Sequence, residues 1–164
     1  MDQPSQVATE EQVIKPKVLY VDDESHNLTA FKSAFRRDFE VFIANSAKEG
    51  LDILANEEIS IIITDQRMPE MTGVEMLEQA VEYEPDAMRI LLTGYSDMQA
   101  VVEAINRGKV YYYMQKPWDE DEVKIIVQNA EEVYRLRKEN KELTKSLLRV
   151  NKQLEFMLRQ KLLS

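Results

Sequence analysis

Short apolar runs alternate with amphipathic segments along most of this chain, and this alternation constrains the fold more than any other feature. Five runs rich in Val, Ile, Leu and Tyr lie at residues 17–21, 39–44, 59–64, 88–92 and 110–114. Four segments with apolar residues at helical spacing separate them, at 27–37, 47–56, 74–83 and 96–107. Strands separated by single helices are joined by right-handed crossovers, which give a parallel sheet covered on both faces. We therefore expect an α/β fold: a doubly wound, five-stranded parallel sheet flanked by five helices.

The two ends of the chain depart from this alternation. Residues 1–16 show no periodicity and contain Pro4 and Pro16, so we expect a flexible N-terminal arm. From Asp119 onward there is no Pro or Gly, so we expect one helix that continues to the end of the chain. The sequence thus predicts an arm over 1–16, an α/β domain over 17–130 and a helical extension over 131–164.

Composition excludes several classes of site. The 164 residues include no cysteine, which excludes disulfides, Cys-ligated zinc, iron–sulfur clusters and a cysteine nucleophile. The single histidine, His26, rules out a zinc site built on several histidines, and we expect it on the surface of the first helix. No stretch is apolar enough to cross a membrane, and the polar N-terminus does not resemble a secretory signal. We expect a cytoplasmic protein without membrane attachment.

Charge is unevenly distributed along the chain. The net charge is −9, and residues 131–164 contribute nine basic and five acidic side chains, so 9 − 5 gives +4 for this segment. The remainder is therefore strongly acidic and repels phosphate backbones, so no direct contact with nucleic acid is expected from the α/β domain. The basic side chains of the tail are most simply a solvated surface.

Chemically capable side chains follow four of the five predicted strands, at Asp22-Asp23, Asp65, Thr93 and Lys116-Pro117. Ligands of open parallel sheets bind at the carboxyl ends of the strands, near the point where the strand order reverses. In the common order 2-1-3-4-5 the first and third strands are neighbours at that point, so the three aspartates should converge. Taken singly, each of these residues is more often part of a turn or a helix cap; their coincidence at successive strand ends carries the interpretation.

Three crowded carboxylates repel one another, and a divalent cation relieves the repulsion. All-oxygen ligands suit Mg²⁺, with Mn²⁺ possible. Lys116 would add a positive charge and Thr93 a hydroxyl donor. Such a pocket suits a phosphoryl group, because metal and ammonium offset its charge and one carboxylate can attack phosphorus.

Four stretches together resemble the receiver domain of bacterial response regulators. They are VLYVDDE (18–24), IIITDQRMPEMTGVEML (61–77), ILLTGYSD (90–97) and YYYMQKPW (111–118). With the alternating pattern, the resemblance covers roughly residues 17–130. The sequence is similar to receivers that are coupled to cyclic-dinucleotide phosphodiesterase or transcriptional output domains.

The resemblance implies a role for each acidic residue of the pocket. Asp65 accepts a phosphoryl group from the phosphohistidine of a sensor histidine kinase or a phosphotransfer protein. Asp23 and Asp65 bind Mg²⁺ directly, together with the backbone carbonyl of Arg67, and Asp22 acts through a metal-bound water. Chemistry would be limited to self-phosphorylation and self-dephosphorylation, without turnover of an external substrate.

The resemblance also implies a switch. Lys116 contacts the acyl phosphate, and the bond between Lys116 and Pro117 is cis. Thr93 moves to bond a phosphoryl oxygen, and Tyr113 changes rotamer with it, with the neighbouring Tyr111 and Tyr112 as alternatives. The fourth helix, fifth strand and fifth helix would read the change.

The helical extension carries apolar residues in a heptad pattern. Val133, Asn140, Leu147 and Leu154 fall at a, and Leu136, Leu143, Val150 and Met157 fall at d. Leucine at d with one asparagine at a favours a parallel two-stranded coiled coil. We expect a homodimer through residues 131–164; the alternatives are a helix packed on its own domain, or a linker to an output domain in a longer protein.

Two other functions fit parts of the sequence. A receiver-like interaction module that works without phosphorylation would be expected to lose Asp65, Lys116 or the acidic pair, and all are present. Phosphatases with an aspartate nucleophile carry a second aspartate two residues later as general acid. Arg67 stands at that position, which makes this alternative poor.

Overall fold

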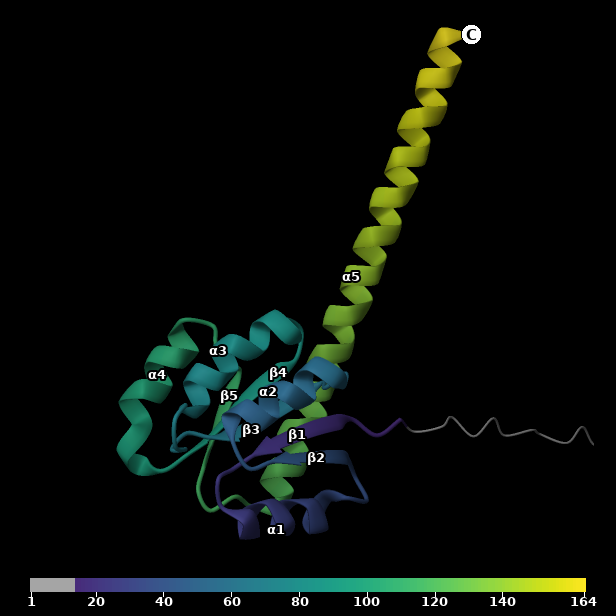
Figure 1. The fold of residues 1–164 in the computed structure, drawn as a ribbon. Coiled ribbons are helices and arrows are strands. Elements are labelled where there is room, and N and C mark those ends of the chain that lie inside the picture. The colour runs from purple at the N-terminus through teal and green to yellow at the C-terminus, as the bar shows by residue number, and fades with distance from the viewer. Residues whose placement is uncertain (1–13) are drawn as a thin grey trace, which may run out of the picture.

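The computed structural model describes residues 14–164 and has the expected doubly wound architecture (Figure 1). Its strands are β1 (Lys17–Val21), β2 (Glu40–Ala44), β3 (Ile61–Asp65), β4 (Met88–Thr93) and β5 (Tyr112–Gln115). Its helices are α1 (Ser25–Phe35), α2 (Ala47–Asn56), α3 (Gly73–Tyr83), the short 3₁₀ helix η1 (Tyr95–Asp97), α4 (Met98–Asn106) and α5 (Glu120–Leu163). All strand pairs are parallel and the order is β2-β1-β3-β4-β5, which confirms the predicted fold class. The predicted arm lies outside the described residues up to residue 13, and residues 14–16 form no regular element.

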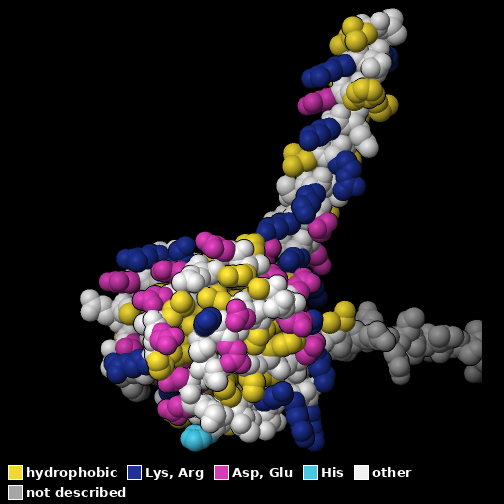
Figure 2. Space-filling model, in the orientation of Figure 1, with side chains coloured by type: hydrophobic (Ala, Val, Ile, Leu, Met, Phe, Trp, Pro, Cys, Tyr) yellow, Lys and Arg dark blue, Asp and Glu magenta, His cyan; other side chains and the backbone are white. Residues whose placement is uncertain are grey.

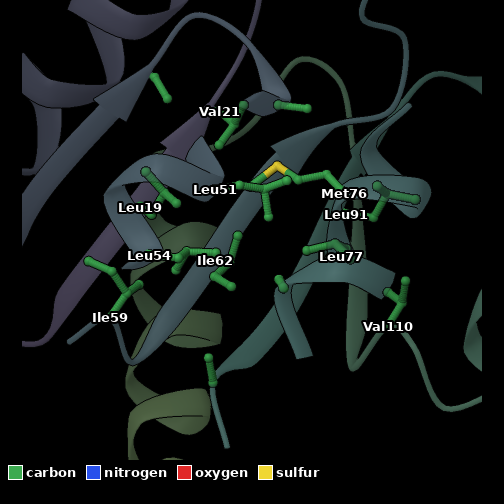
Figure 3. Close-up of a cluster of buried hydrophobic side chains, with 14 of the residues drawn as sticks. Leu19, Val21, Leu51, Leu54, Ile59, Ile62, Met76, Leu77, Leu91 and Val110 are labelled. Carbon is green, nitrogen blue, oxygen red and sulfur yellow. The ribbon is translucent and has the colours of Figure 1, made fainter. Parts of the chain in front are cut away.

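Two apolar layers cover the sheet, because successive residues of a strand face opposite sides. Leu19, Ile62 and Leu91 lie in the layer under α2, α3 and α4, which Figure 3 shows in close-up. Tyr20 and Ile63 belong to the opposite layer, beneath α1 and α5. The sheet is thus buried on both faces, as its continuous apolar runs predict.

Local sequence signals set the helix boundaries. The Ser46 side chain caps α2 by accepting from the Glu49 backbone N–H. Thr72 and Glu75 form a reciprocal capping box at the start of α3. The chain leaves α4 at Gly108, where φ is +70°, a left-handed conformation that favours glycine. The predicted helix over 96–107 is shorter in the structure, because η1 occupies its first turn.

Helix α5 begins on the sheet and continues far beyond it (Figure 1). Its buried residues are Val123, Val127, Ala130 and Tyr134. The last contact with the body in the described chain is the ion pair between Lys141 Nζ and Asp86 Oδ2, at 2.6 Å. Residues 142–163 are all exposed, which leaves about 33 Å of helix at 1.5 Å per residue without cover. Among residues 14–164, no helix is long and apolar enough to cross a membrane.

Candidate functional site

Three aspartates meet at the carboxyl edge of the sheet, as the strand order predicts. Asp22 and Asp23 follow β1, and Asp65 is the last residue of the neighbouring strand β3. Each offers a carboxylate oxygen, and these oxygens all lie within 4.8 Å of one another. Asp22 and Asp65 are buried, whereas Asp23 is exposed. The trio therefore combines two buried carboxylates with one that is open to solvent.

Asp22 is held by three neutral donors. The Glu24 backbone N–H donates to Oδ1 at 3.0 Å. The Tyr20 hydroxyl and the Asn27 amide both donate to Oδ2, at 2.9 and 3.1 Å. Buried carboxylates need such partners, because an unpaired polar atom away from water is costly. The carboxylate is thus fixed in orientation before any ligand arrives.

Asp65 is paired with Lys116, whose Nζ lies 2.8 Å from Asp65 Oδ2. Burial raises the pKa of Asp65; the Lys116 ammonium opposes this rise, and the negative charges of Asp22 and Asp23 add to it. The carboxylate therefore sits in a crowded, partly desolvated site whose charge is only partly offset. A further positive charge would relieve it.

Strands β4 and β5 bring Thr93 and Lys116 beside Asp65. Asp65 pairs with Leu92 across the sheet, and the Lys116 backbone N–H donates to the Thr93 carbonyl at 3.0 Å. The Thr93 side chain is fully buried and its hydroxyl donates to the Gly94 carbonyl at 3.1 Å. The peptide bond between Lys116 and Pro117 is cis, as the resemblance implied. Tyr113 lies half-buried on β5 and packs against the core under α2, α3 and α4.

The loop that follows Asp65 is tied back to the sheet by Gln66. Its backbone N–H donates to the Leu92 carbonyl at 3.1 Å, and its carbonyl accepts from the Gly73 N–H at 3.0 Å. Its side-chain Oε1 accepts from the Val74 N–H at 3.0 Å, at the start of α3. These bonds fix the backbone on which Asp65 is carried. Gln66 could not be recognised from the sequence, because a glutamine in a loop gives no signal of burial.

The Arg67 side chain reaches from the loop after β3 to η1. Its Nε donates to both carboxylate oxygens of Asp97, at 3.2 and 3.0 Å, and its Nη2 donates to the Ser96 hydroxyl at 3.0 Å. The side chain thereby links the loop after β3 to η1, which follows Thr93. The resemblance assigns a role only to the backbone carbonyl of Arg67, not to its side chain. Long-range partners such as Asp97 cannot be recognised without the fold.

The donor set suits Mg²⁺. The three converging carboxylates offer only oxygen atoms as ligands, and the exposed Asp23 leaves the site open to water. The three negative charges of the trio exceed the single positive charge of Lys116. Mg²⁺ prefers oxygen ligands and keeps several waters. Asp22, Asp23 and Asp65 are therefore the residues that would hold the ion.

A cavity of about 450 Å³ lies beside Lys116. Its lining residues are Tyr20, Asn27, Leu92, Lys116, Pro117 and Trp118. Two of these residues, Tyr20 and Asn27, are also donors to the Asp22 carboxylate, so the cavity adjoins the acidic trio through them.

Comparison with known proteins agrees with this geometry. A family model described as "Response regulator receiver domain" matches residues 18–128. The chain is 36% identical over 126 residues to the hydrogenase transcriptional regulatory protein HoxA of Bradyrhizobium diazoefficiens, covering 77% of this chain and 26% of that protein. The chain therefore spans about a quarter of the length of this curated relative.

Solved structures show the same likeness. One described as adenylate cyclase from Rhodopirellula baltica has a TM-score of 0.78 at 31% identity, covering 80% of this chain and 98% of that one. A response regulator receiver domain protein from Clostridium thermocellum has a TM-score of 0.68 at 32% identity, covering 74% of this chain and 97% of that one. Both matches cover nearly all of the solved chain and leave part of this chain uncovered.

Proposed function

The chain belongs to the response regulator receiver family, and from that premise we propose that it accepts a phosphoryl group on Asp65 in a Mg²⁺-dependent reaction. Receiver domains interact with histidine kinases or phosphotransfer proteins, which we propose as its donors. One observation carries the proposal: the acidic trio and Lys116 converge on one point at the carboxyl edge of the sheet.

The chain's own residues divide the work of phosphoryl transfer. An Asp65 carboxylate oxygen attacks phosphorus of the donor phosphohistidine, the phosphorus–nitrogen bond breaks, and the imidazole nitrogen leaves with the electron pair. Lys116, which is paired with Asp65 in this structure, would stabilise the negative charge that develops on the phosphoryl oxygens. Asp23 and Asp65, with the Arg67 carbonyl, would hold the metal directly, and Asp22 through a water. Bound Mg²⁺ neutralises charge that develops on the phosphoryl oxygens.

A conformational switch would follow from the added charge. The Thr93 hydroxyl bonds the Gly94 carbonyl in this structure, and we propose that it exchanges this partner for a phosphoryl oxygen. Movement of Thr93 frees space on the face to which the half-buried Tyr113 belongs. The signal would appear on the surface formed by α4, β5 and α5. A shift from 1:99 to 99:1 requires about 5.5 kcal/mol of differential stabilisation.

We propose that α5 carries the output, as a parallel coiled coil with a second copy of this chain. Figure 2 shows apolar side chains at intervals along its projecting part, interspersed with basic ones. The d-position residues Leu143, Val150 and Met157 are 70%, 49% and 65% exposed, and a facing helix would cover them. Val133, the first a position, packs instead against the body, so the coil would begin after it. The domain division we propose remains 1–16, 17–130 and 131–164.

The alternative we propose for the output is a longer natural protein. The curated relative named as a transcriptional regulator is about four times as long as the matched region, so an output domain after the coil is compatible with the match. We propose no direct contact of the acidic α/β body with nucleic acid. A receiver-like module that works without phosphorylation is less well supported, because the Asp65–Lys116 pair is intact.

The test is intact mass spectrometry of the full chain after incubation with a small phosphodonor and Mg²⁺. The account predicts a gain of one phosphoryl mass that requires Mg²⁺ and is absent in Asp65→Ala. Asp86→Ala is the matched control, because Asp86 is also a buried aspartate paired with a lysine but lies at the far end of the body. No gain, or an equal gain in Asp65→Ala, would refute the assignment.

A further inference from the structure

Tyr20 is a buried tyrosine whose hydroxyl points at the acidic trio. It lies within β1, is fully buried, and donates to Asp22 Oδ2 at 2.9 Å. A phenylalanine would fill the same apolar layer without placing a polar atom there. The hydroxyl therefore adds a specific contact to a carboxylate that packing alone does not require.

The ring that carries this hydroxyl is held rigidly. It stacks on Phe31 of α1, with ring centroids 4.1 Å apart and planes inclined by 11°. Phe31 in turn meets Trp118 edge-on, with centroids 5.8 Å apart. Since Trp118 directly precedes the cap of α5, the aromatic contacts run from the acidic trio to the base of that helix.

Tyr20 also shares its acceptor. Asp22 Oδ2 receives both Tyr20 and the Asn27 amide, while Oδ1 receives the Glu24 N–H. With both oxygens engaged, rotation of the carboxylate would break at least one bond. Asp22 is proposed to reach the metal through a bound water, and groups that hydrogen-bond such an outer carboxylate hold it in place and sustain metal affinity.

We propose that Tyr20 is a positioning residue for Mg²⁺ binding: its hydroxyl, braced by Phe31, fixes the Asp22 carboxylate in the orientation that the metal site requires. This inference rests on the proposed function and assigns a residue outside the acidic trio to it. Tyr20 acts only through Asp22 and is not placed in contact with the metal or the phosphoryl group.

The test compares Tyr20→Phe with Tyr134→Phe in the full chain. Tyr134 is a matched control, because its hydroxyl also donates to a carboxylate, Glu58 Oε1 at 3.3 Å, on α5 far from the trio. Mg²⁺ affinity is measured by calorimetric titration and by the fluorescence of Trp118, the only tryptophan in the chain. We expect Tyr20→Phe to weaken Mg²⁺ binding by about tenfold, and Tyr134→Phe to leave it unchanged.

A second readout separates positioning from general damage. Circular dichroism must show the fold of Tyr20→Phe intact, and its phosphorylation rate should return to the wild-type value at saturating Mg²⁺. Unchanged Mg²⁺ affinity in Tyr20→Phe, equal weakening in both variants, or a rate that excess Mg²⁺ does not restore overturns the inference while the proposed function stands. A wild-type chain that neither binds Mg²⁺ nor accepts a phosphoryl group overturns both.

Discussion

Replacing Gly73 with alanine is expected to disturb the backbone that carries the phosphoacceptor. Gly73 is the first residue of α3 and packs directly under the end of β3. A Cβ atom there would lie 2.3 Å from the Asp65 carbonyl oxygen and 2.9 Å from Leu91 Cδ1. The first neighbour is backbone, so it cannot rotate away, and Asp65 or the start of α3 must move.

The expected loss in the free energy of unfolding of Gly73→Ala is moderate. Adding a methylene to a well-packed site costs about 1–3 kcal/mol. Alanine returns about 0.4–1 kcal/mol through the lower entropy of the unfolded chain. The difference of the two midpoints is a net loss of about 1.3 kcal/mol, within a range of about 0–2.6 kcal/mol. A loss of about 1.3 kcal/mol lowers Tm by about 3–5 °C for a chain of this size.

Two other glycines provide a graded control. An added Cβ at Gly94 meets nothing within 4 Å, so Gly94→Ala should be neutral or slightly stabilising. At Gly50 the nearest atom, at 2.7 Å, is Met76 Cε, the end of a flexible side chain. Gly50→Ala should therefore cost less than Gly73→Ala, because a methionine can adopt another rotamer.

Thermal unfolding followed by circular dichroism, at one fixed protein concentration, measures the series. The predicted order of stability is Gly94→Ala, then Gly50→Ala, then Gly73→Ala. Phosphorylation of Gly73→Ala should also slow, because Asp65 is displaced from Lys116. A Gly73→Ala variant as stable as Gly94→Ala would show that the contact between α3 and the end of β3 is not as close as described.

Three further outcomes follow from the site and the tail. Asp65→Asn should be more stable than the wild type at neutral pH, because folding raises the pKa of Asp65 and the folded chain therefore binds its proton more tightly than the unfolded chain does. This stability advantage should disappear below pH of about 4, where both states hold the proton. An advantage that stays constant across pH in urea titrations would contradict this reasoning. Mg²⁺ at 100 times its Kd should stabilise the wild type by about 2.7 kcal/mol. Asp23→Asn should lose most of this stabilisation, as measured by thermal shift. Equal stabilisation of the wild type and the variant by Mg²⁺ would show that Asp23 is not part of the metal site. Asn140→Ile should convert a uniform dimer into mixed oligomers in analytical ultracentrifugation, and a monomeric wild type would contradict the coiled coil.

Much of the fold follows from the sequence because its signals are local and repeated. Continuous apolar runs such as 59–64 identify strands buried on both faces, and Ser46 and Gly108 mark helix ends by their capping chemistry. Boundaries shifted by a residue or two where tertiary pairing decides. The last strand begins at Tyr112 rather than at residue 110, because Tyr112 is the residue that pairs with Ile90.

The convergence of the three aspartates was also predictable from the sequence, but the side-chain contacts around them were not. Residues at the carboxyl ends of parallel strands must share one edge, which brings Asp22, Asp23 and Asp65 together. The hydroxyl of Tyr20 and the clamp from Arg67 to Asp97 depend on rotamers and on the path of loops. Neither has a periodicity or a spacing by which sequence alone could reveal it.

The most direct measurement of the central claim is to trap the phosphorylated side chain and locate it. Borohydride reduces an aspartyl phosphate to homoserine, which survives proteolysis and can be placed by peptide sequencing in a mass spectrometer. After phosphorylation in Mg²⁺, the account predicts homoserine at position 65 alone. Homoserine at Asp22 or Asp23, or an unaltered peptide throughout, would contradict it.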